Sequence, residues 1–105
     1  MGYAVFGAKS TTQLQRHIRT VAKDSAAIFV LKHAKARMKE RKISILEVYE
    51  ILRSGLLQRT PEPNPSKGTL ECRMERYVAG RNCAAVVALD DDNPNLLVVT
   101  VMFNK

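Results

Sequence analysis

Tryptophan is absent from this 105-residue sequence, and tyrosine and phenylalanine contribute only three residues each. The hydrophobic core therefore has to be mainly aliphatic. The two cysteines, Cys72 and Cys83, form no Cys-x-x-Cys pair and no histidine–cysteine cluster at metal-ligand spacing, which argues against a structural zinc site. We interpret both as core thiols, and we predict that the protein uses no cofactor.

Common enzyme signatures and targeting segments are also missing. The sequence has no Gly-rich nucleotide-binding loop, no Gly-x-Ser-x-Gly and no metal-binding histidine pair. No segment approaches the length of a membrane span. The apolar residues 1–8 are few and lack the basic start of a signal peptide, so we expect a cytoplasmic protein that does not bind a membrane.

The length and the composition predict one globular domain. Hydrophobic residues make up 46% and charged residues 26% of the chain, which is typical of a folded protein rather than a disordered one. A single core is feasible at this size. We assign residues 1–105 to one domain and leave open whether residues 1–9 form a flexible N-terminal segment.

The positive charge is concentrated in the first part of the chain. Residues 9–42 contain ten basic and two acidic residues, a net charge of 10 − 2 = +8, whereas the remainder carries 7 − 8 = −1. Such an asymmetry favours an anionic partner, either nucleic acid or an acidic protein.

Capping and periodicity predict three helices in the first half. A capping box at residues 10–13 starts a helix that ends near residue 25, and a second helix covers residues 32–42. A second capping box at residues 44–47 starts a third helix, which Gly55 ends. The apolar run at residues 27–31 fits either an edge strand or a buried entry to the second helix.

The residue pattern in the second half of the sequence predicts strands. Three prolines at alternate positions make residues 60–68 a loop, either a plain connector or a flap that carries Lys67 into a site. Strands follow at residues 70–78, 82–89 and 96–103, separated by turns. We predict an α+β fold: a three-stranded antiparallel sheet, with or without the extra edge strand, packed on the N-terminal helices.

The alternation along the first of these strands predicts a charged open face. A hairpin turn at Gly80-Arg81 pairs Tyr77 with Ala84 and keeps Cys72 and Cys83 from facing each other, so that no disulfide forms. Charged residues of one strand then lie beside small residues of the next, which gives a concave surface. The residues on this face are Glu71, Arg73, Glu75, Tyr77, Ala84, Val86 and Ala88.

His33, Arg37 and Arg41 recur every four residues and therefore stack along one face of the second helix. The resulting cationic stripe carries one titratable imidazole. Two interpretations stay open: a grip for a polyanion, or a solvated helix face.

A metal-free ribonuclease would need a base for the 2′-hydroxyl, cations for the phosphate and an acid for the leaving oxygen. The candidates for proton transfer are His33, Glu71 and Tyr77, with Glu75 as a further carboxylate. The candidates for phosphate binding are Arg37, Arg41, Arg73, Arg76, Arg81 and Lys67. The competing interpretation is that these are ordinary exposed strand and turn residues.

One group of residues carries a family resemblance. It runs through His33, Ala34, Arg37, Met38, Arg41, Ile43, Ser44, Glu47 and Val48, then Gly80-Arg81, then a terminal strand at residues 98–101. This pattern resembles the bacterial "domain of unknown function 4258" family and, more distantly, the motility quorum-sensing regulator and RelE/ParE-like toxins.

The resemblance implies a RelE-toxin-like fold and an RNA-cleaving or RNA-binding module. Its RNA partner would be mRNA, free or on the ribosome, and an antitoxin protein would neutralise it. The family-typical positions are His33, Arg37 and Arg41, with Arg81 as their counterpart in the sheet. Where the closer toxin relative has catalytic side chains on its sheet, this chain has Glu71 and Cys83.

Three hypotheses follow. The first is an mRNA endoribonuclease of the toxin type. The second is a non-enzymatic module that binds nucleic acid or an acidic protein through residues 9–42, with an affinity that falls steeply with salt. The third is a small structural or regulatory protein whose basic helices supply only solubility.

Overall fold

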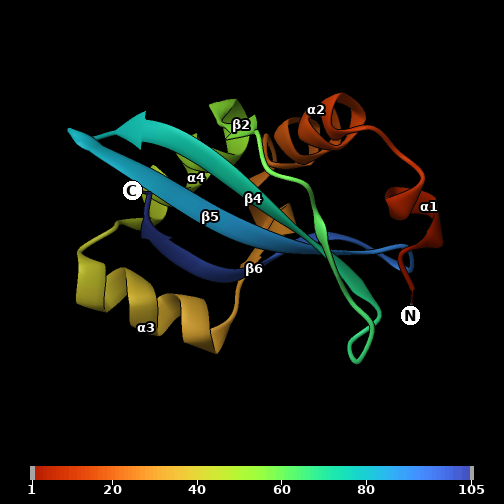
Figure 1. Ribbon diagram of the computed structural model, residues 1–105. Coiled ribbons are helices and arrows are strands. Elements are labelled where there is room, and N and C mark those ends of the chain that lie inside the picture. The colour runs from red at the N-terminus through yellow and green to blue at the C-terminus, as the bar shows by residue number, and fades with distance from the viewer. Residues whose placement is uncertain (1, 105) are drawn as a thin grey trace.

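A computed structural model describes residues 2–104 and shows an α+β protein in which helices surround a curved sheet (Figure 1). The helices are α1 (Ala4–Gly7), α2 (Thr11–Val21), a short 3-10 turn η1 (Ser25–Ala27), α3 (Lys32–Arg41) and α4 (Ile45–Ser54). The strands are β1 (Ile28–Val30), β2 (Leu56–Leu57), β3 (Glu62–Asn64), β4 (Thr69–Val78), β5 (Arg81–Asp90) and β6 (Asn93–Phe103).

The sheet has six strands in the described residues, and the predicted three-stranded antiparallel sheet is wrong. The strand order is β1-β6-β5-β4-β2, and β3 also pairs with β4. Strand β1 runs parallel to β6, so the sheet is mixed. The predicted sheet was too small because β2 has only two residues and β3 contains Pro63, which the sequence pattern assigned to a loop.

In the hairpin of β4 and β5, the charged residues of β4 share a face with small residues of β5, as predicted. Glu71 lies opposite Ala88, and Arg73 lies opposite Val86. The turn, however, is at Ala79-Gly80, one residue earlier than predicted, and both residues have positive φ angles of 52° and 79°, as a two-residue hairpin turn requires. Tyr77 therefore pairs with Asn82 instead of Ala84. The two cysteines are buried and free.

Both predicted capping boxes are present. Ser10 accepts a hydrogen bond from the Gln13 amide at the start of α2, and Ser44 does the same for Glu47 at the start of α4. The Gln and Glu side chains bond back to the Ser amides. Lys42 ends α3 in the left-handed region at φ 54°, which turns the chain sharply toward α4.

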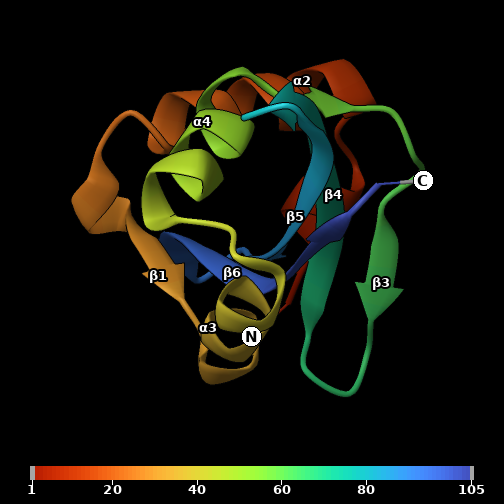
Figure 2. The same ribbon diagram turned by 90° about the vertical axis from the view of Figure 1, so that its left-hand side faces the viewer.

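Helices α2 and α4 lie on one side of the sheet, and α3 lies beside β6 (Figure 2). The core between them is mainly aliphatic, as predicted, and burial raises the pKa of Cys72 to about 12. None of the helices within residues 2–104 is both long and apolar enough to cross a membrane. The largest fully buried side chains include Leu14, Ile18, Ile51, Leu52, Met74, Leu89, Leu96 and Val98.

Helix α1 is attached to the turn between β5 and β6. The Asp91 carboxylate accepts hydrogen bonds from the amides of Val5 (2.9 Å) and Phe6 (3.1 Å), as an acidic side chain does at a helix N-terminus. The Asp91 amide donates to the Gly2 carbonyl at 2.7 Å, and the Phe6 ring joins the core. These contacts place residues 2–7 beside the end of the sheet opposite the Ala79-Gly80 turn.

Candidate functional site

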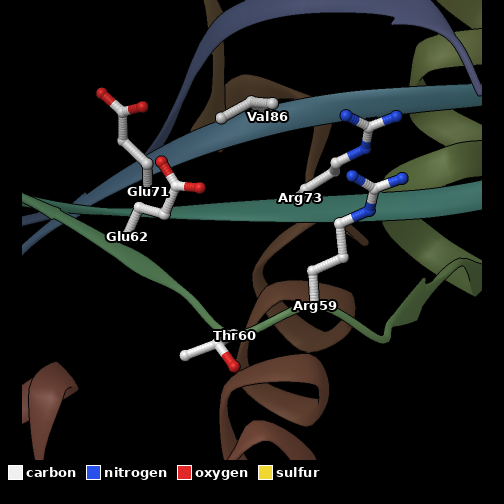
Figure 3. Close-up of a pocket in the computed structure, with 6 residues that line it drawn as sticks. All are labelled: Arg59, Thr60, Glu62, Glu71, Arg73 and Val86. Atoms are coloured by element: carbon white, nitrogen blue, oxygen red, sulfur yellow. The ribbon is translucent and has the colours of Figure 1, made fainter.

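The face of the sheet opposite α2 and α4 carries a small pocket where β3, β4 and β5 meet (Figure 3). Its volume is about 170 Å³. Strand alternation creates it, because side chains at every second position of β4 point away from the core. The lining residues are Arg59, Thr60, Glu62, Glu71, Arg73 and Val86.

One end of the pocket holds an arginine pair. The guanidinium groups of Arg59 and Arg73 lie side by side (Figure 3). Both lie near the buried Glu75 carboxylate, with Nε to carboxylate oxygen distances of 3.7 and 3.9 Å. Both also donate to Asn104 Oδ1, Arg73 at 2.7 Å and Arg59 at 3.4 Å. Glu75 and Asn104 therefore hold the two like charges together.

Arg73 has one buried donor that the fold leaves without a hydrogen bond. Its Nε is buried and makes no hydrogen bond. Buried guanidinium donors are normally all paired, because an unpaired one forfeits its hydration. This Nε lies 3.9 Å from the Glu75 carboxylate, beyond hydrogen-bond distance.

The other end of the pocket holds two carboxylates, those of Glu62 and Glu71, on the far side of Val86 (Figure 3). The two glutamates are directly opposite each other in the β3–β4 ladder, and like charges in that position destabilise a sheet. Asn64 Nδ2 donates to Glu71 Oε2 at 3.1 Å. The pairing of like charges is thus unfavourable for the sheet, and Asn64 offsets part of its cost at Glu71.

Two of the predicted site residues, Glu71 and Arg73, therefore line one pocket, with Cα atoms about 7 Å apart along β4. Tyr77 lies on the same face and is 64% exposed, but six residues from Glu71, about 20 Å. His33 lies exposed in the first turn of α3, on a helix that packs beside β6. The structure does not bring the three predicted proton-transfer residues together.

The arginines of the predicted α3 stripe bond to the fold itself. Arg37 pairs with Glu40 within the helix. Arg41 Nη1 donates to the Val101 carbonyl at 2.9 Å, on the part of the β6 edge that the short β1 does not cover. The exposed Lys67 lies in the turn between β3 and β4 and does not line the pocket.

Arg81 has the largest structural role of the predicted arginines. It donates to the carbonyls of Arg41 (3.0 Å) and Lys42 (2.9 Å), at the C-terminus of α3. It also pairs with Glu47 at 3.0 Å and lies 5.0 Å over the Phe103 ring. Burial acts to raise the pKa of Glu47, but hydrogen bonds from Ser44 and Arg81 outweigh it and hold that pKa below its ordinary value.

Arg76 is on the opposite face of β4 and points to the helices. Its Nε lies 3.2 Å from the Glu50 carboxylate on α4. Arg73 and Arg76 are three positions apart in the sequence, and strand alternation therefore sends them to opposite sides of the sheet. Of these two arginines, Arg73 lines the pocket and Arg76 does not.

Sequence reasoning did not single out Arg59 or Glu62. Glu62 belongs to the segment 60–68 that was assigned to a connecting loop and instead pairs with the outer edge of β4. Arg59 precedes that segment and lies between β2 and β3. A signal was present, because Pro63 is compatible with an edge strand and alternate prolines keep a chain extended.

The comparisons with known proteins agree with one part of the resemblance. The sequence pattern of the domain of unknown function DUF4258 matches residues 30–103, which covers α3, α4 and β2 to β6. The protein is an α+β protein with a mixed sheet, and it belongs to the DUF4258 family. No curated protein and no solved structure matches the chain significantly.

Proposed function

We propose that this protein is an RNA-binding endoribonuclease of the toxin type, with its active site in the pocket between Arg59, Arg73 and Glu71. The observation that carries the proposal is the pairing of two adjacent guanidinium groups with two unneutralised carboxylates around one small cavity. The net charge of +7 would attract an RNA chain to the molecule.

The proposed chemistry uses the two ends of the pocket differently. Glu71 takes the proton of a ribose 2′-hydroxyl, and the freed oxygen attacks the adjacent phosphorus. The 2′-oxygen–phosphorus bond forms as the bond to the 5′-oxygen breaks, and that oxygen takes a proton from water. The products are a 2′,3′-cyclic phosphate and a 5′-hydroxyl end.

The arginine pair would stabilise the charge that develops on the phosphate. Arg59 and Arg73 present planar donor groups suited to phosphate oxygens, and the Arg59 side chain is 55% exposed. Since Glu75 and Asn104 already hold both side chains, little reorganisation is needed when the charge appears.

Tyr77 fits an RNA-binding role better than proton transfer. Its ring is 64% exposed on the same face of β4 as Arg73, about 13 Å further along the strand. An exposed aromatic ring on the same face as a phosphate site offers a stacking surface for an unpaired base of the bound strand. We give His33 no part in the chemistry, since it lies on α3.

The second candidate is a non-enzymatic RNA-binding module. It is favoured by Glu75, whose buried carboxylate already neutralises part of the arginine charge. Under this alternative the pocket holds a phosphate without activating the 2′-hydroxyl. Glu71→Gln then leaves the effect of the protein on RNA unchanged.

The test is incubation of the purified protein with labelled mRNA in EDTA, with and without ribosomes. We expect cleavage that Glu71→Gln reduces by about a hundredfold or more. Glu50→Gln is the matched control, because Glu50 lies on α4 and pairs with Arg76. Salt-sensitive binding without cleavage would support the second candidate, and neither binding nor cleavage would contradict both.

A toxin role adds a cellular expectation. Expression of the protein alone should inhibit growth, and a neighbouring antitoxin should relieve the inhibition. Glu71→Gln expressed at the same level should be harmless, whereas Glu50→Gln should inhibit as the wild type does. If the wild type and both variants are harmless when expressed, the toxin role is contradicted. RNA cleavage by the purified protein is tested independently by the incubation with labelled mRNA.

A further inference from the structure

An apolar groove lies on the opposite edge of the sheet from the pocket, where β1 passes between α3 and α4. Figure 2 shows β1 at the edge, with α4 above it and α3 below it. The groove has a volume of about 540 Å³. Its lining residues are Ile28, Phe29, Val30, Leu31, Lys35, Met38, Ile45 and Tyr49.

Several of these side chains are exposed although they are large and apolar. Phe29 is 49%, Leu31 40% and Ile45 38% exposed. Single exposed apolar residues are ordinary, but a contiguous group that lines a groove marks an interaction surface. The three come from β1, from the residue after it, and from the first turn of α4, so folding brings them together.

The backbone of β1 has an unused edge. Strand β1 is the last in the sheet, and the Leu31 amide donates to the Val98 carbonyl of β6 at 3.0 Å. Alternate residues of a strand direct their backbone groups to the same side. The amide and carbonyl of Val30 therefore point away from β6, toward the groove.

The charges around the groove are positive. Lys35 is among its lining residues, and Lys32 and Lys39 lie three residues before it and four after it, on the same face of α3. The two acidic residues of α4, Glu47 and Glu50, form ion pairs with arginines of β5 and β4. The lysine stripe is thus left without carboxylates from α4.

We propose that this groove binds an extended, acidic segment of a partner protein by strand addition. The apolar side chains of the segment would fill the groove, its backbone would pair with Val30, and its carboxylates would face the lysine stripe. A second copy of this chain is a poorer occupant, because pairing two β1 edges would bring two lysine stripes together. The proposal does not depend on the RNA chemistry proposed for the pocket.

The test uses two fluorescent peptides, one of alternating valine and glutamate and one of alternating valine and lysine. We expect the full-length protein to bind the acidic peptide with at least about tenfold preference, as measured by fluorescence anisotropy at low salt. Lys35→Glu should weaken this binding by about tenfold. Lys67→Glu is the matched control, since Lys67 is an exposed lysine in the β3–β4 turn, and it should leave the affinity unchanged.

Hydrogen exchange tests the strand pairing separately. Binding of the acidic peptide should protect the Val30 amide, and Phe29→Ser should weaken binding while the fold stays intact by circular dichroism. The proposal is overturned if both peptides bind alike or neither binds. It is also overturned if the Val30 amide stays unprotected in the complex, or if the protein alone is a dimer that Phe29→Ser converts to a monomer.

Discussion

Arg73 and Arg81 belong to the two strands of one hairpin, yet their surroundings differ completely. Arg81 donates to two backbone carbonyls at the end of α3, pairs with Glu47 and covers the Phe103 ring. Arg73 shares the carboxylate of Glu75 with Arg59, and its Nε makes no hydrogen bond. Arg81 therefore joins elements of the fold to one another, whereas Arg73 lines the pocket beside Arg59.

The difference shows that residue type alone does not predict how an arginine is used. Arg81, Arg37 and Arg41 are among the residues on which the family resemblance was based, and all three bond to other groups of the fold. The distinguishing property is the state of each guanidinium: whether its donors are satisfied and which face of the sheet it lies on.

The largest effect in this comparison is expected for Arg73→Ala. Loss of one charge-stabilising donor in a preorganised site should reduce RNA cleavage by about 100- to 1,000-fold. Arg76→Ala is the control on the same strand, because Arg76 points to the helices and pairs with Glu50. A single-turnover assay with labelled mRNA measures both, and equal losses would contradict the assignment of the pocket.

The next effect is a loss of stability in Arg81→Ala. Removal of two carbonyl contacts, an ion pair and a ring contact should lower the free energy of unfolding by about 2 kcal/mol, or the melting temperature by roughly 10 °C. Urea unfolding measures it. Cleavage per folded molecule should stay near the wild-type value, and a large loss of that activity would place Arg81 in the site.

The Arg81 effect should depend on pH in a defined direction. Because Glu47 has a lowered pKa in the folded protein, its contribution to stability is fully present above the ordinary carboxyl pKa. That contribution is lost as the pH falls through the lowered value. The stability difference between wild type and Arg81→Ala should therefore shrink from pH 7 to about pH 3. A constant difference would mean that the carbonyl and ring contacts carry the whole effect.

The smallest expected effect has the opposite sign. Glu62→Gln removes one of two like charges that face each other across β3 and β4, and it should stabilise the protein by a few tenths of a kcal/mol. Glu50→Gln, which breaks an ion pair with Arg76, should destabilise by a similar amount. Urea unfolding of both variants measures these shifts. If the two midpoints move in the same direction, the carboxylate pair does not destabilise the fold.

The sequence predicted the parts of the fold that have strong local signals. Two capping boxes defined α2 and α4, and alternating residues placed Glu71 and Arg73 on the face that also carries Val86 and Ala88, although the predicted pairing was displaced. Each of these depends on neighbours a few residues apart, whose spacing a sequence shows directly.

The parts that could not be predicted depend on pairing between distant segments. β2 and β3 are too short to show alternation, and they form because the outer edge of β4 accepts their backbone groups. Arg59 reaches the pocket only through that pairing. The hydrogen-bond partners of Arg81 lie about forty residues earlier in the chain. Its structural role could therefore not be predicted from its sequence neighbours either.

The most direct measurement is the salt dependence of RNA binding for wild type, Arg73→Ala and Arg81→Ala, at a temperature where all three are folded. Each lost phosphate contact lowers the slope of log Kd against log salt by about 0.7 for a single strand. We predict this decrease for Arg73→Ala and an unchanged slope for Arg81→Ala. An unchanged slope for Arg73→Ala, with a decrease for Arg81→Ala, would contradict the assignment of the pocket as the RNA site.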